Sequence, residues 1–178
     1  FPDAIRKLIR LDPQFVMSIG DFITGYMEDR KWINQDWVDV AVELAPLKVP
    51  FFYTVGNHDQ TNPVLVDEWT KRFGRSYYHF SYKNVLFLVL NSEDGGYSKI
   101  SQTQLDYFRK ALADNPNPRW TFVFLHKPIW DKHEDADEKK DGSDGRTAFL
   151  KFEEMMKGKK YTVFCGHTHQ YSRDVRDG

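Results

Sequence analysis

Short apolar runs alternate with amphipathic segments along this chain, and each predicts one element of secondary structure. Runs rich in β-branched and aromatic residues predict strands at residues 14–19, 51–55, 77–82, 84–90, 120–125 and 161–165. Apolar residues at helical spacing predict helices at residues 3–11, 32–44, 64–73 and 147–156, and another that begins at Ser101. This alternation is typical of a largely parallel sheet with helices outside it.

Local signals refine three of these elements. Lys83 and Asn84 separate two strands and predict a hairpin. Ser101 is followed three residues later by Gln104, which predicts a capping box at the helix start. Residues 131–146 are charged, contain glycine and have few large apolar side chains, so they predict a mobile surface loop.

Four predicted strands end on side chains that can bind a metal ion. In chain order, the strand ends are Gly20-Asp21, Gly56-Asn57-His58-Asp59, His126-Lys127-Pro128 and Gly166-His167-Thr168-His169. Each one alone has a plainer explanation, because Gly-Asp and Gly-Asn are common turns and a single histidine after a strand is usually a core residue. The ligand site of an open α/β sheet lies beyond the carboxyl ends of its strands, so the four ends can converge.

In this order, the four stretches resemble the calcineurin-like metallophosphoesterase family. The resemblance implies one domain over residues 1–178 with a four-layer α/β/β/α sandwich of two mixed sheets. The family pattern opens with an Asp-x-His motif at a first strand end, and none occurs in residues 1–13. We expect the domain to be incomplete at both ends, with that motif present in the natural protein. The alternative is a degenerate site.

The resemblance also implies a role for each ligand-capable residue. Asp21 would bridge two divalent ions, Mn, Fe or Zn, with Ni and Mg as further options. One ion would be completed by Asn57, His126 and His167. The other would be held by His169 and by the absent motif, so in this chain it should bind weakly or not at all.

The same family likeness implies a metal-dependent phosphoester hydrolase, either a phosphatase or a phosphodiesterase. A metal-bound hydroxide would attack phosphorus. His58 would act as general acid or stabilise the transition state, with Asp59 orienting its imidazole. The alternatives are a catalytically impaired scaffold with this fold, which binds partner proteins, and a mononuclear metal protein.

Several other residues are weaker candidates. His133 could approach substrate but suits a solvated loop better, and Cys165 suits a buried packing role. Purple acid phosphatases carry a tyrosinate ligand three residues after the Gly-Asp aspartate, and this chain has Thr24 there, which argues against that subfamily. Aromatic residues near the motifs could stack on a substrate ring, although rim or core packing is the commoner role; these are Tyr26, Trp130 and Tyr171.

The composition of the chain restricts the classes of molecule that it can bind. The chain has 178 residues, of which 40% are hydrophobic, enough for one sizeable core. Its formal net charge of −1 gives no basic field for nucleic acid, and a single cysteine allows no internal disulfide. No apolar run approaches the roughly 18 residues of a transmembrane helix. We therefore expect a small phosphoester or a phosphoprotein as substrate, and no feature selects a compartment or an oligomeric state.

Overall fold

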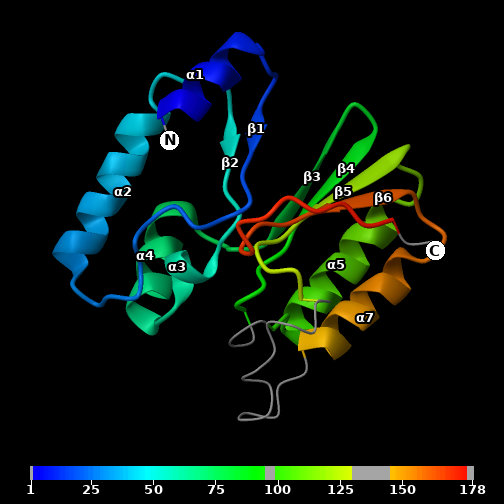
Figure 1. The fold of residues 1–178 in the computed structure, drawn as a ribbon. Helices are drawn as coiled ribbons and strands as arrows, with labels where there is room; N and C mark the ends of the chain where they lie inside the picture. Colours follow the sequence, from blue (N-terminus) through cyan, green and yellow to red (C-terminus); the bar gives the residue numbers. More distant parts are fainter. Residues whose placement is uncertain (1, 95–98, 130–144, 176–178) are drawn as a thin grey trace.

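The computed structural model describes residues 2–94, 99–129 and 145–175, and their helices and strands form four layers (Figure 1). The smaller sheet pairs β1 (Val16–Met17) with β2 (Phe51–Phe52) in parallel. The larger sheet has the order β3-β4-β5-β6, in which β3 and β4 are antiparallel and the other two pairs are parallel. Its strands are β3 (Tyr78–Tyr82), β4 (Val85–Val89), β5 (Trp120–Phe124) and β6 (Tyr161–Phe164).

Helices cover the outer face of each sheet. The smaller sheet is flanked by α1 (Pro2–Arg10), α2 (Arg30–Leu44) and α4 (Pro63–Phe73), and the larger sheet by α5 (Gln102–Asp114) and α7 (Gly145–Met156) (Figure 1). One further turn of helix, α3 (Asn57–Gln60), is the next element after β2 along the chain. The predicted α/β/β/α sandwich is confirmed, although only the larger of its two sheets is mixed.

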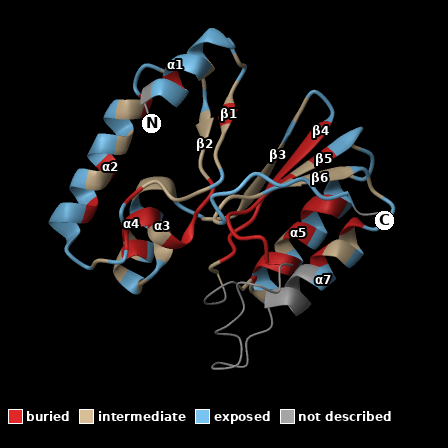
Figure 2. Cartoon of the chain, in the orientation of Figure 1, coloured by how far each residue is buried: buried red, intermediate tan, exposed pale blue. Residues whose placement is uncertain are grey.

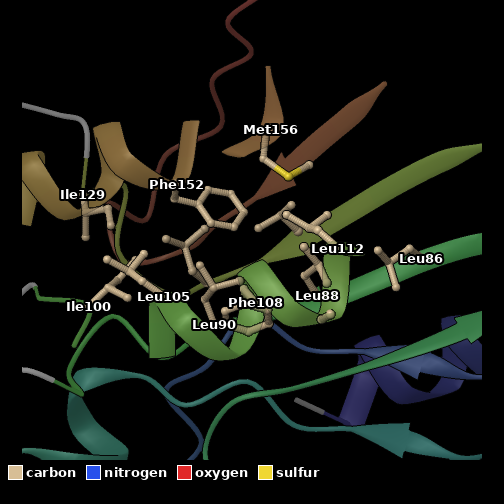
Figure 3. Packing of buried hydrophobic residues seen from close by; sticks show 13 residues of the cluster. Leu86, Leu88, Leu90, Ile100, Leu105, Phe108, Leu112, Ile129, Phe152 and Met156 are labelled. Carbon is tan, nitrogen blue, oxygen red and sulfur yellow. The ribbon is translucent and has the colours of Figure 1, made fainter. Parts of the chain in front are cut away.

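Three apolar cores hold these layers together. Between the sheets, aromatic rings from both sides meet, with Phe52 stacked on Phe80 at 4.3 Å between centroids and Phe15 edge-on to Phe87. A second core joins α2 and α4 to the smaller sheet around Trp37 and Trp69. The third joins α5 and α7 to the larger sheet, and Figure 3 shows its packing around Phe108 and Phe152. Figure 2 shows the buried residues concentrated along β4 and the inner sides of α4 and α5.

The predicted hairpin is present, and its turn shows why these residues suit it. Lys83 and Asn84 both have left-handed backbone, with φ of 47° and 59°. Two such residues in succession form the turn whose twist matches that of the flanking strands.

Four local predictions were wrong. Gln104 does not complete a capping box: Ser101 Oγ accepts from Gln104 N–H, but the Gln104 side chain is buried and bonds both backbone groups of Asn91. The strands β1 and β2 are shorter than predicted, because Thr54 N–H donates to Ser18 Oγ where the backbone ladder would continue. Residues 57–60 form a helical turn where none was predicted. Finally, α7 begins at Gly145, inside the predicted loop. The rest of that loop, including His133, and the preceding Trp130 lie outside the described residues.

Within the described part of the chain, no helix combines the length and apolar character needed to cross a bilayer.

Candidate metal centre

The segments that follow β1, β2, β5 and β6 come together near the middle of Figure 1. Three side chains from them meet there: Asp21, His126 and His167 each offer one ligand atom, and these atoms all lie within 4.8 Å of one another. His126 Nε2 lies 3.0 Å from Asp21 Oδ2 and 3.2 Å from His167 Nδ1. Residues separated by more than 100 positions in the sequence thus share one cluster of nitrogen and oxygen ligand atoms.

His126 is held in the orientation that a metal ligand needs. Its ring is 2% exposed, and its Nδ1 lies 2.6 Å from the carbonyl oxygen of Ile19. This contact commits Nδ1 and leaves Nε2 facing Asp21 and His167. Burial lowers the pKa of His126, but the hydrogen bonds to Asp21 and Ile19 outweigh burial and raise it above its ordinary value.

The two carboxylate oxygens of Asp21 contact segments that follow strands of different sheets. Oδ1 accepts from the backbone N–H of His58 at 3.0 Å, and Oδ2 faces His126. Burial would raise the pKa of Asp21, yet the hydrogen bond and the charge of His126 keep it below its ordinary value. The carboxylate is therefore ionised at neutral pH and suits a cation.

Asn57 carries the clearest sign of a missing partner. Its side chain is buried, and its Nδ2 donates to the Tyr26 hydroxyl at 2.7 Å, while its Oδ1 is buried without a hydrogen-bond partner among the residues that the structure describes. A buried acceptor without a partner is destabilising by about 1–3 kcal/mol. An amide oxygen is also a hard donor that divalent ions accept. The residues present therefore fit the ion that the site chemistry implies.

Two glycines make the close approach of these segments possible. A Cβ on Gly20 would lie 2.7 Å from His126 Nδ1, and Gly20 has φ of +92°. A Cβ on Gly56 would overlap the Asp21 carboxylate. The Gly-Asp and Gly-Asn signals of the sequence are thus steric requirements of the site as well as turns.

Asp59 does not orient His58, so that part of the prediction was wrong. Its carboxylate is 1% exposed and accepts backbone N–H groups of Asp21, Phe22 and Gly56 at 2.8–2.9 Å. Burial raises its pKa to about 6 against the opposing effect of these bonds. Successive residues of a helical turn point in different directions, so the side chains of His58 and Asp59 diverge. Asp59 instead joins the turns after β1 and β2.

His58 is oriented by a different segment. Its Nδ1 lies 2.6 Å from the Thr24 carbonyl oxygen, which leaves Nε2 as the nitrogen available to a substrate. The ring of Tyr26 packs edge-on against it at 4.8 Å. No sequence pattern predicts the Thr24 contact, since any residue type supplies a backbone carbonyl. From the sequence, Tyr26 is a candidate only for stacking on a substrate ring.

The two histidines after β6 differ. His167 faces His126, and burial together with the charges of His126 and Lys127 lowers its pKa to about 4, so it is neutral and able to bind a metal. His169 is exposed and lies outside the three-residue group. Both have left-handed backbone, with φ of 70° and 53°. Tyr171, two residues further on, is 94% exposed.

Comparison with known proteins shows the family of this chain. A family model described as calcineurin-like phosphoesterase matches residues 1–171. The chain belongs to the calcineurin-like phosphoesterase family. Within this family, the serine/threonine-protein phosphatase CPPED1 of Bos taurus is 29% identical over 138 residues, which cover 71% of this chain and 44% of that protein. The chain spans about half the length of the curated relatives it matches.

Two solved structures share the fold of this calcineurin-like phosphoesterase. A dimetal phosphatase from Danio rerio superposes with a TM-score of 0.54 and 16% identity, over 72% of this chain and 59% of that one. A purple acid phosphatase from yellow lupin superposes with a TM-score of 0.67 and 18% identity, over 93% of this chain and 33% of that one. At such identities the likeness concerns the fold alone.

Proposed function

We propose that this chain forms the metal-binding site of a hydrolase that cleaves phosphoester bonds in small molecules or phosphoproteins. The main support is that Asp21, His126 and His167 bring their ligand atoms within 4.8 Å of one another. Asn57 precedes His58, whose N–H donates to Asp21, and its buried amide oxygen has no partner among the described residues. When bound, divalent ions would polarise a phosphoryl oxygen and lower the pKa of a water molecule, so that hydroxide is the nucleophile.

The remaining steps fall to side chains of the protein. In hydrolysis, water adds to phosphorus, the bond from phosphorus to the leaving oxygen breaks, and the leaving oxygen takes a proton. We assign to His58 either the donation of that proton or the stabilisation of negative charge on the phosphoryl group. Its Nδ1 is occupied by the Thr24 carbonyl oxygen, so its Nε2 remains available for this role. Asp59 has a structural task only, since its carboxylate is occupied by backbone N–H groups.

For the substrate class, a phosphoserine or phosphothreonine side chain is our first choice. The relatives matched along most of this chain are named serine/threonine-protein phosphatases. The formal charge of −1 also offers no excess of cations for a nucleic-acid backbone.

A protein that uses a single ion is the second candidate, and one observation favours it. Among the described residues, one group of His, Cys, Asp and Glu could hold an ion, and His169 lies outside it. Counting bound ions against activity separates the two functions: a two-ion enzyme needs a second equivalent for turnover, and a single-ion protein does not.

The test is manganese-dependent hydrolysis of p-nitrophenyl phosphate and bis-p-nitrophenyl phosphate by the natural protein. We expect Asp21→Ala and His58→Ala to abolish nearly all turnover. The matched control is His79→Gln on β3, where the imidazole contacts Tyr107 on the outer face of the larger sheet and should leave turnover unchanged. Full turnover in either site variant would overturn the assigned roles.

A further inference from the structure

The turn formed by residues 24–26 lies directly on Asn57 and His58, and it touches them in four ways. The Thr24 carbonyl oxygen contacts His58 Nδ1, and the Tyr26 ring packs edge-on to the His58 ring. The Tyr26 hydroxyl accepts from Asn57 Nδ2 at 2.7 Å. Gly25 lies so close to the His58 backbone that a Cβ there would overlap its carbonyl oxygen.

The backbone of this turn is unusual at Tyr26. Its φ is 54°, directly after Gly25 with φ of 63°. An aromatic residue rarely adopts left-handed backbone, since its Cβ crowds the following carbonyl. Burial does not explain the conformation, because Tyr26 is 56% exposed. Such a residue persists when specific contacts hold it, and these positions cluster at functional sites.

The contact with Asn57 has a direct consequence for metal binding. The two ends of a side-chain amide have nearly the same shape, so hydrogen bonds decide which end faces which way. Within the described part of the chain, the Asn57 oxygen is buried without a partner, while its nitrogen donates to the Tyr26 hydroxyl. Only the oxygen can bind a cation, since the amide nitrogen has no lone pair to offer.

We propose that Tyr26 is a positioning residue, whose hydroxyl fixes the amide of Asn57 so that its oxygen faces the bound ion. This rests on the proposed function only in that an ion binds at this site. Tyr26 acts through Asn57 and touches neither the ion nor the phosphoryl group. Without the hydroxyl, the amide can turn its N–H groups towards the site, where they repel a cation.

The test is calorimetric titration of metal-free protein with Mn²⁺, comparing the unmodified chain with Tyr26→Phe. Phenylalanine keeps the ring and its packing on His58, so only the hydroxyl is lost. We expect Mn²⁺ to bind about 10- to 100-fold more weakly, as is typical when a partner of a metal ligand is removed. The control is Tyr107→Phe, which loses a hydroxyl contact of 2.8 Å to His79 on the outer face of the larger sheet and should bind Mn²⁺ as before.

Repeating the Tyr26→Phe substitution in an Asn57→Asp variant distinguishes a positioning role of Tyr26 from a general loss of structure. In Asn57→Asp, both ends of the side chain are oxygens, so no orientation needs to be selected. Adding Tyr26→Phe to Asn57→Asp should then change the Mn²⁺ affinity less than about threefold, and the double-mutant cycle should be strongly non-additive. Thermal melts of each metal-free variant confirm that the fold is retained.

Each outcome has a distinct meaning. Equal Mn²⁺ affinity for Tyr26→Phe and the unmodified chain would overturn the positioning role, as would the same loss in the Asn57→Asp background. Mn²⁺ binding that depends on Tyr26 without any phosphoester hydrolysis would leave the inference standing and remove the proposed function. No Mn²⁺ binding by the unmodified chain would overturn both.

Discussion

The two halves of the candidate metal centre are built differently. After β1 and β2, the turns that carry Asp21 and Asn57 are joined by a buried carboxylate, Asp59, that accepts three backbone N–H groups. After β6, the turn that carries His167 and His169 is joined to the segment after β5 by a backbone bond, from Gly166 N–H to the His126 carbonyl oxygen at 2.9 Å. Within the turn, Thr168 N–H donates to the Gly166 carbonyl oxygen. Its tip is exposed.

This difference indicates how each half reaches its binding geometry. The first half is preorganised, because its ligands are fixed by hydrogen bonds within the protein. The second half holds neutral His167 against His126 and leaves His169 in solvent, so an ion should order it further. Substitutions in the first half should therefore reduce both folding stability and ion binding, and those in the second half should reduce ion binding alone.

The largest effect is expected from Asp59→Ala. Three N–H groups, one of them buried and two partly buried, would lose their acceptor, each at a cost of about 1–3 kcal/mol. The free energy of unfolding should therefore fall by roughly 4 kcal/mol in all. Chemical denaturation of the metal-free protein measures this. The control is Asp29→Ala, which removes an exposed carboxylate that caps α2 and should lose only about 1 kcal/mol. If Asp59→Ala lowers the free energy of unfolding no more than Asp29→Ala does, the first half is not preorganised by Asp59.

The candidate ligands of both halves can be predicted from the sequence, but the groups that hold them cannot. Asp21, Asn57, His126 and His167 could be found because each follows an apolar run that predicts a strand, and parallel strands end at one edge. The partners could not, because they are backbone groups or distant side chains. The carbonyl oxygens of Ile19 and Thr24 orient His126 and His58, and any residue type supplies a carbonyl.

At two places in the chain, sequence spacing is a poor guide to which groups form hydrogen bonds with each other. Asp59 follows His58 directly, which suggested a pair, yet the helical turn of α3 separates their side chains. Gln104 stands at the correct spacing for a capping box, yet its amide is used to bond the buried backbone of Asn91. In both cases a buried backbone group that needed a partner outweighed the local pattern.

An intermediate loss of folding stability is expected from a substitution of Lys127, which lies where the two halves meet. It follows His126, and its ammonium group forms an ion pair with Glu93 at 3.1 Å, with side chains only 2% and 7% exposed. Lys127→Met would leave a buried carboxylate unpaired, which should lower the unfolding free energy by about 3 kcal/mol near pH 8. The control is Lys110→Met, whose exposed pair with Asp114 should contribute under about 1 kcal/mol.

The pH dependence of this variant follows from the environment of Glu93. Burial raises the pKa of Glu93, and Lys127 opposes that rise. Without Lys127 the folded-state pKa climbs further above the unfolded value, so the folded protein binds the extra proton as pH falls. The destabilisation should therefore be smaller at pH 5 than at pH 8. A loss that is the same at both pH values would mean that the carboxylate is not the cause.

The smallest effect on folding stability is expected from His169→Ala, and this variant gives the sharpest test of the difference between the two halves. His169 is exposed and outside the group of ligand atoms, so His169→Ala should change the unfolding free energy by less than about 0.5 kcal/mol and leave the tightly bound ion in place. His167→Ala should be equally mild for folding but should weaken Mn²⁺ binding more than about tenfold, which corresponds to 1.4 kcal/mol. Elemental analysis of the unmodified chain should find well below two ions per chain. Because the two residues share one turn, a loss of Mn²⁺ affinity in both variants would place His169 on the same ion as His167, and the division of ligands between two ions would fail.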